Sequence, residues 1–210
     1  MKLFDPEGPV MVALGKLADL VFCNVLFLLC SLPVFTMGAS LAALYDCTLR
    51  ISADTEEQLI VLQFLRAFRR NFKTATKLWL ICLGAIALLT GYRFAVSAMA
   101  GELQRVYRVT FWFLAFVFLA GFQYIFPLQA RYEMGVKAIL KNAWLLALAA
   151  LPWTLCALLV PAAAIYVSFF MQPEAANIFF FLWVFAVPAV IAYLDSFFYR
   201  KAFQKLPQAQ

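Results

Sequence analysis

The sequence contains no histidine and little charge, since Lys, Arg, Asp and Glu together make up only 13% of its 210 residues. The absence of histidine removes the commonest general base and the commonest zinc and haem ligand. The cysteines form no C-x-x-C pair, and most of them lie inside apolar runs, which indicates neither a disulfide framework nor a metal site. The motifs G-x-S-x-G and H-E-x-x-H are also missing. We therefore expect no cofactor, no metal and no enzymatic activity.

Polar surface is too scarce for a soluble domain of this length, because 66% of the residues are hydrophobic. Several separate apolar runs reach about 20 residues, the length that crosses about 30 Å of hydrocarbon. The alternating pattern of an outer-membrane β-barrel is missing. The sequence therefore predicts an all-α, polytopic transmembrane helix bundle that forms a single membrane domain.

The apolar runs predict six membrane spans. Their ranges are 10–32, 37–51, 77–100, 109–130, 142–171 and 178–198. The second run is short, and its small residues suit close packing between helices. The alternative is that this run is a re-entrant or interfacial piece, which leaves five spans.

Residues 10–51 form a predicted helix–break–helix hairpin, with the break at Pro33, Thr36 and Gly38. Pro33 removes a backbone donor and disfavours a helical conformation at the residue before it. Thr36 is placed to cap the N-terminus of the second helix. Gly38 allows another helix to approach closely.

The only substantial polar segment, residues 54–77, is predicted to be a basic amphipathic helix. Acidic residues open it, where the helix dipole favours them, and a basic face follows that comprises Arg66, Arg69, Arg70, Lys73 and Lys77. We expect this helix to lie on anionic lipid headgroups at the cytoplasmic surface. Contact with a soluble partner is the alternative. Residues 77–198 hold four further spans.

The distribution of Lys and Arg predicts the orientation. Twelve of them fall in segments 50–77 and 131–141 and in the tail after residue 198, against three in segments 93–108 and 172–177. The richer side is expected to be cytoplasmic, which places the protein in the inner membrane with a cytoplasmic C-terminus. Six spans place the N-terminus inside as well, and five place it outside. Because the basic residues flank apolar spans, no nucleic acid partner is expected.

Five polar residues fall within the predicted spans: Asp19, Asn24, Asp46, Gln123 and Asp195. Asn24 and Gln123 lie deep and suit hydrogen bonds between helices. Asp46 can pair with Arg50 one turn later. Asp19 and Asp195 lie near span ends, where local pairing explains them. The functional alternative is a proton or ion path built on Asp46 and Asp19.

Several short motifs, in order, resemble a known family. They are Asn24 with the leucine-rich run after it, Pro33-x-x-Thr36-x-Gly38, Ala42-Ala43-Leu44-Tyr45, the set Phe64, Phe68, Asn71, Phe72 and Lys73, then Pro127-Leu128-x-Ala130-x-Tyr132 and Lys141-Asn142-Ala143. Together they resemble the YesL family of predicted bacterial integral membrane proteins, a family of unknown function. Members of that family tend to be encoded near carbohydrate-uptake systems.

The resemblance implies an accessory or regulatory membrane protein associated with bacterial carbohydrate uptake. The expected partner is then an uptake permease, or a second copy of the chain. A small transporter or channel subunit that moves a solute or an ion is the alternative function. An intramembrane enzyme is the third possibility, and the resemblance supplies no catalytic residues for it.

Overall fold

The computed structural model describes residues 9–55, 59–168 and 176–205, and these residues form helices and no strands. The acidic residues Glu56 and Glu57, at the start of the predicted basic helix, lie outside this part. The helices are α1 (Pro9–Ser31), α2 (Met37–Ile51), α3 (Ile60–Ser97), α4 (Glu102–Arg131), α5 (Val136–Ala149), α6 (Leu151–Tyr166), α7 (Ala176–Phe185) and α8 (Val187–Phe203), with a 3-10 turn, η2 (Val34–Thr36), before α2.

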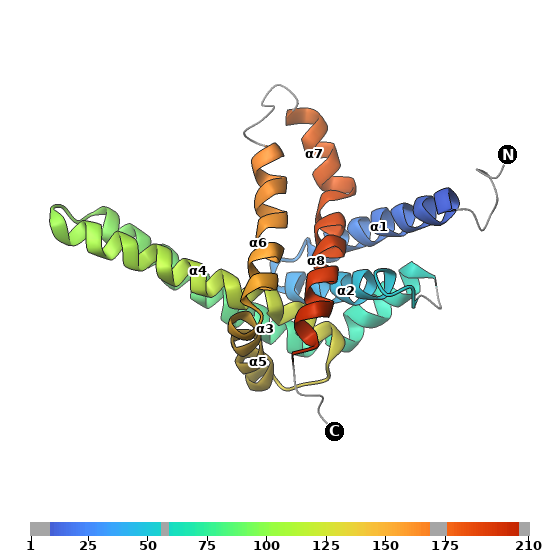
Figure 1. Ribbon diagram of the computed structural model, residues 1–210, viewed down its shortest axis with the longest axis horizontal. Helices are drawn as coiled ribbons and strands as arrows, with labels where there is room; N and C mark the ends of the chain where they lie inside the picture. Colours follow the sequence, from blue (N-terminus) through green and yellow to red (C-terminus); the bar gives the residue numbers. More distant parts are fainter. Residues whose placement is uncertain (1–8, 56–58, 169–175, 206–210) are drawn as a thin grey trace.

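Helix α2 lies at the centre of the molecule. It packs against α1, α3, α4 and α8, and most of its side chains are buried. Figure 1 shows α1 running to the right of this centre, the α3–α4 hairpin to the left, and α6 with α7 upward. The all-helical prediction is confirmed, and the shortest of the predicted spans forms the core.

The break between α1 and α2 falls at the predicted residues, but Thr36 does not cap α2. Its hydroxyl donates backward, to the Cys30 carbonyl at 2.6 Å and the Pro33 carbonyl at 2.7 Å. It makes no side-chain capping bond to an N–H group of α2. The predicted capping role was therefore wrong. The hydroxyl instead satisfies the Cys30 carbonyl in the last turn of α1, where carbonyl groups lack helical donors.

Gly38 brings α2 against α3. A Cβ atom at this position would lie 2.5 Å from Trp79 Cβ and 2.6 Å from the Ala75 carbonyl oxygen. Trp79 also donates its indole N–H to the Val34 carbonyl in the break, at 2.7 Å. The predicted close approach at Gly38 is therefore present, and the middle of α3 is its partner.

The basic segment and the span predicted after it form one helix. Helix α3 runs without interruption for 38 residues, which corresponds to about 57 Å. The boundary predicted at Lys77 marks a change in surface rather than the end of a helix. One face of α3 stays buried as far as Cys82, whereas Leu80 and Leu88 expose apolar side chains.

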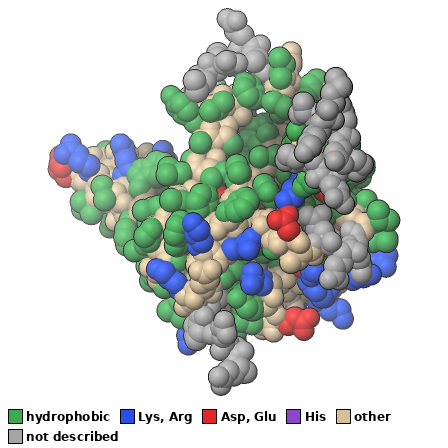
Figure 2. Space-filling model, turned by 45° about the vertical axis from the view of Figure 1, so that its right-hand side comes forward, with side chains coloured by type: hydrophobic (Ala, Val, Ile, Leu, Met, Phe, Trp, Pro, Cys, Tyr) green, Lys and Arg blue, Asp and Glu red, His purple; other side chains and the backbone are tan. Residues whose placement is uncertain are grey.

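Among the residues that the structure describes, three helices are long and apolar enough to cross a membrane, namely α1, α3 and α4. The count rises to five if two bent pairs, α5–α6 with a 99° bend and α7–α8 with a 59° bend, each form one span. Helix α2 has 15 residues, or about 22 Å, and is not among these candidates. Six spans are therefore not confirmed. The apolar surface of Figure 2 fits a membrane protein, with Lys and Arg gathered on the lower part and at the left-hand tip.

Candidate functional site

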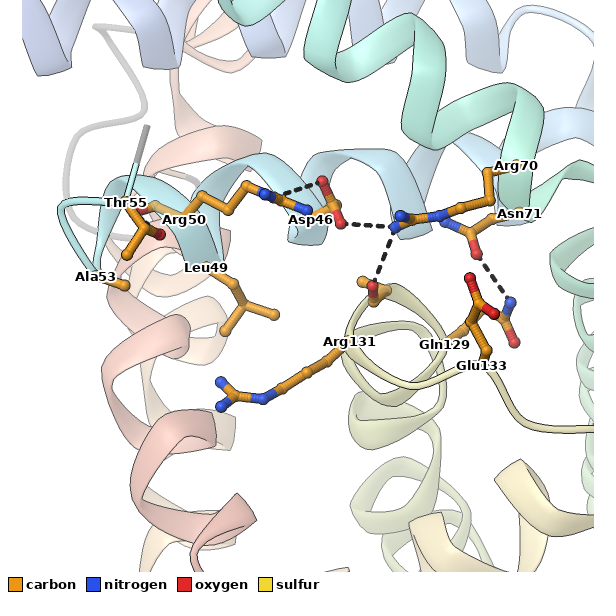
Figure 3. Close-up of a pocket in the computed structure, with 11 residues that line it drawn as sticks. Asp46, Leu49, Arg50, Ala53, Thr55, Arg70, Asn71, Gln129, Arg131 and Glu133 are labelled. Carbon is orange, nitrogen blue, oxygen red and sulfur yellow. Dashed lines mark hydrogen bonds and ion pairs between the residues drawn. The ribbon is translucent and has the colours of Figure 1, made fainter. Parts of the chain in front are cut away.

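A pocket of about 370 Å³ opens where the C-terminal half of α2, the N-terminal third of α3 and the end of α4 meet. Figure 3 shows that its charged side chains come from all three helices. It is lined by Asp46, Leu49, Arg50, Ala53, Thr55, Arg70, Asn71, Gln129, Ala130, Arg131 and Glu133. Three arginines and two carboxylates in one pocket make it the leading candidate site.

Asp46 lies between two arginines (Figure 3). Its side chain is only 7% exposed and accepts hydrogen bonds from Arg50 Nε at 3.1 Å and from Arg70 Nη2 at 2.9 Å. The pair with Arg50 is the one predicted from the i, i+4 spacing. The pair with Arg70 was not foreseen, because Arg70 was assigned to the lipid-facing side of its helix.

Arg70 connects all three helices at the pocket. Besides Asp46 on α2, its guanidinium donates to the Ala130 carbonyl of α4, at 3.4 Å. Ala130 lies in the last turn of α4, where carbonyl groups have no helical donor and the helix dipole favours a cation. Arg70 thus helps to hold α3 against α2 and α4, and its half-exposed side chain still lines the pocket.

Gln129 and Asn71 form the buried wall of the pocket. Gln129 donates from Nε2 to Asn71 Oδ1 at 2.9 Å, and Asn71 donates to the Ala67 carbonyl at 3.0 Å. Both side chains are more than nine-tenths buried. Gln129 Oε1 has no hydrogen-bond partner within the described residues. A buried acceptor without a donor is costly, so this oxygen suits a ligand or water that donates a hydrogen bond.

Arg131 completes the positive charge of the pocket. Its guanidinium lies 5.9 Å from the ring centre of Tyr132 and 5.7 Å from that of Phe203 on α8. Within the part of the chain that the structure describes, it makes no ion pair with a carboxylate. Cation–π contacts hold a guanidinium in place without neutralising it. Arg131 is therefore the guanidinium best placed to meet an incoming anion.

The pocket suits anion binding better than metal binding. Three guanidinium groups against two carboxylates leave a net positive charge, and planar guanidinium forks match carboxylate and phosphate oxygens. Among the described residues, no group of three His, Cys, Asp or Glu side chains could hold a metal ion.

The sequence did not single out Asn71, Gln129, Arg131 or Glu133 as site residues. Each is a common polar residue, and their convergence depends on contacts between distant helices.

Of the polar residues predicted within the spans, the structure brings only Asp46 to this pocket. Asp19 lies half-buried on α1. Asn24 is fully buried and binds the backbone between α7 and α8, donating to the Val184 carbonyl at 2.7 Å and accepting from the Ala189 N–H at 3.0 Å. The predicted hydrogen bond of Asn24 across the bundle is therefore present.

Gln123 and Asp195 lie elsewhere in the core. Gln123 donates to the Thr154 carbonyl at 3.2 Å, so it joins α4 to the start of α6 just after the sharp α5–α6 bend. Asp195 is 2% exposed on α8, and its Oδ1 atom has no hydrogen-bond partner within the described residues. A path that joins Asp46 to Asp19 stays a prediction.

The basic face predicted on α3 divides in the structure. Arg70 turns into the pocket, while the remaining members, Arg66, Arg69, Lys73 and Lys77, have exposed side chains. Contact of these side chains with lipid headgroups or a partner stays a prediction.

Residues 20–91 match a family described as "Protein of unknown function, DUF624". The matched segment runs from the middle of α1 through α2 and most of α3, and it includes Asn24, Gly38, Asp46 and Arg70. No curated protein and no solved structure matches the chain significantly. The match is to a family of unknown function, and the apolar helices fit a membrane protein. The pocket therefore has to be interpreted from its own chemistry.

Proposed function

We propose that the protein is a non-enzymatic membrane protein that acts as an accessory or regulatory component and binds a small anion in the arginine pocket. The observation that carries this proposal is the convergence of Arg50, Arg70 and Arg131 from three helices on one pocket of about 370 Å³. That volume suits a small molecule rather than a peptide.

The pocket is prepared for a ligand by the contacts that hold its arginines. Asp46 orients Arg50 and Arg70, and two aromatic rings position Arg131. Side chains that are already ordered lose less entropy when a ligand binds. The Gln129 oxygen adds an acceptor, which favours an anion that also carries a hydroxyl or another hydrogen-bond donor.

The pocket is proposed to face the cytoplasm of the inner membrane. It lies among the segments that are richest in Lys and Arg, which the positive-inside rule assigns to that side. The exposed basic residues of α3, among them Arg69 and Lys73, are proposed to contact anionic headgroups near the same opening. Occupancy of the pocket would then depend on the cytoplasmic concentration of the anion, and the membrane-embedded helices would respond to that occupancy.

The proposed partner is a carbohydrate-uptake permease, or a second copy of the chain. The support is the resemblance of the motifs around Asn24, Gly38 and Asn71 to the YesL family. Co-purification of a permease from native membranes would support the accessory role. Loss of that co-purification in a variant with Arg66, Arg69 and Lys73 replaced by Gln would assign the contact to the exposed face of α3. Unchanged co-purification in this variant would exclude that face.

Anion binding can be tested on the purified full-length chain in a neutral detergent, so that no anionic lipid competes. We expect inorganic phosphate or citrate to raise the thermal unfolding midpoint, relative to sodium chloride at equal ionic strength. Arg131→Gln should weaken binding by about tenfold, the value of one charge-assisted hydrogen bond. Arg105→Gln is the matched control, since Arg105 is 77% exposed at the far α3–α4 turn. Equal effects of both variants, or no response of the natural chain, would refute the pocket.

A small transporter or channel subunit is the second candidate function. The observation that favours it is Asp195, a carboxyl group buried in the helix core without a hydrogen-bond partner for Oδ1 among the described residues. Ionisable groups inside membrane helices commonly mark ion or proton pathways. Flux of protons or a labelled solute through reconstituted vesicles, lost in Asp195→Asn, would favour this candidate over an accessory role.

A further inference from the structure

Asp195 lies in the core of the molecule rather than at its surface. Its helix, α8, packs against α2 and α6, and only 2% of the residue is exposed. Ala192 and Ser196 on the same helix are also buried, and Ser196 donates to the Ala192 carbonyl at 2.7 Å and to the Thr48 hydroxyl at 3.2 Å. Asp195 therefore lies on the face of α8 that is buried against its neighbours.

Three tyrosines form a contiguous cluster in the core that includes α8. They are Tyr45 on α2, Tyr124 on α4 and Tyr199 on α8. The ring of Tyr199 lies 5.7 Å from that of Tyr45 and 5.3 Å from that of Tyr124, centre to centre. Tyr124 also shares a hydrogen bond of 2.9 Å with the Thr154 hydroxyl of α6. Phenol and hydroxyl groups of α2, α4, α6 and α8 therefore meet in the core.

No cation neutralises Asp195 within the part of the chain that the structure describes. The nearest basic residues along α8 are engaged elsewhere, because Arg200 donates to the Ser52 carbonyl and Lys201 lies 4.5 Å from the ring centre of Trp153. From α1 and α7, no described ionisable side chain makes an ion pair with it. An ionised carboxylate buried without a cation is strongly unfavourable, whereas the neutral acid can exchange hydrogen bonds with hydroxyl groups.

We propose that Asp195, whose Oδ1 has no hydrogen-bond partner among the described residues, is a buried proton-binding site. The carboxyl group holds a proton while α8 is packed on α2. It releases the proton only when these helices separate enough to admit water or a cation, since the ionised form needs solvation. Proton exchange is therefore linked to a movement of α8. This inference does not depend on the arginine pocket, which involves other residues.

Infrared spectroscopy of the full-length protein in lipid vesicles tests the proposal. At neutral pH we expect the C=O stretching band of a protonated carboxyl group in the natural chain, and its loss in Asp195→Asn. Asp54→Asn is the control, because the Asp54 side chain is 75% exposed and forms an ion pair with Lys16. That variant should keep the band.

A measurement on the natural chain covers the case in which Asp195→Asn does not fold. When aspartate is labelled with ¹³C in its side-chain carboxyl group, the C=O stretching band of any protonated aspartate shifts. A neutral aspartate can therefore be recognised without a substitution. A shifted band at neutral pH that persists when Asp5→Asn and Asp19→Asn are introduced supports the proposal, because Asp46 is ion-paired and Asp54 is exposed. If every aspartate band at neutral pH is that of an ionised carboxylate, the proposal is overturned.

Discussion

Asn24 supplies the hydrogen bond that Pro188 cannot make. In a continuous helix, the N–H group of residue 188 would donate to the Val184 carbonyl, but proline has no N–H. Asn24 Nδ2 on α1 donates to that carbonyl at 2.7 Å, and its Oδ1 accepts the Ala189 N–H at 3.0 Å. One side chain therefore satisfies the backbone on both sides of the break between α7 and α8.

Replacing Asn24 by leucine should destabilise the packing of α1 on α7 and α8. The change leaves a buried carbonyl and a buried N–H without partners, at a cost of about 1–3 kcal/mol. The measurement is unfolding in mixed detergent micelles, followed by circular dichroism. Asn177→Leu is the control, because Asn177 is exposed on α7. If the two variants unfold alike, the break does not depend on Asn24.

Gly38→Ala should be destabilising although alanine favours helices. The added Cβ would lie 2.5 Å from Trp79 Cβ and 2.6 Å from a backbone oxygen, so α2 and α3 must move apart. Overpacking of this kind costs about 1–3 kcal/mol. Gly84→Ala on the outer part of α3 meets nothing within 4 Å and should be neutral or slightly stabilising. Equal unfolding midpoints for the two variants would contradict the close contact.

Local patterns in the sequence predicted those features that depend on neighbouring residues. Pro33 predicted the end of α1, and the i, i+4 spacing predicted the pair of Asp46 with Arg50. The depth of Asn24 in an apolar run predicted a partner on another helix, but not which one. These features follow from backbone chemistry and helical periodicity.

The pocket depends on contacts between distant helices, which helical periodicity in the sequence does not reveal. Arg70 lies on the polar face of its helix, and a polar face can meet headgroups or a carboxylate of another helix equally well. Its partner Asp46 is 24 residues away, and Gln129 is 58 residues from Asn71.

The continuity of α3 was missed for another reason. Hydropathy changes at Lys77, but the sequence from Ile60 to Leu83 contains no Gly or Pro to end the helix.

Asp46→Asn should strengthen anion binding and weaken the fold. The change removes one negative charge from the pocket and frees Arg50 and Arg70 for a ligand. It also removes the contact that holds Arg70 of α3 to α2, although the half-exposed arginines limit this loss to about 1 kcal/mol. Phosphate titrations and unfolding midpoints of the same preparation separate the two effects. Weaker phosphate binding in Asp46→Asn would mean that Asp46 acts by positioning the arginines rather than by competing with the anion.

The start of α1 should lie on the same side of the membrane as the α2–α3 loop. Lys16 on α1 forms an ion pair of 2.5 Å with Asp54 in that loop, so both groups share one end of the molecule. The loop adjoins the Lys- and Arg-rich segments, which the positive-inside rule assigns to the cytoplasm. The topology prediction is therefore a cytoplasmic start of α1, whether α2 crosses the bilayer or turns back within it.

Single cysteines placed in a cysteine-free chain at Met11, Thr55 and Met99 test this topology. All three residues are exposed, and Met99 lies in the turn between α3 and α4, at the opposite end of α3 from Thr55. An impermeant thiol reagent added to intact cells should label position 99 and leave positions 11 and 55 unlabelled until the membrane is opened. Labelling of positions 11 and 99 but not of position 55 would mean that Lys16 and Asp54 lie on opposite sides of the bilayer. It would then exclude the ion pair and the arrangement of α1 beside α2.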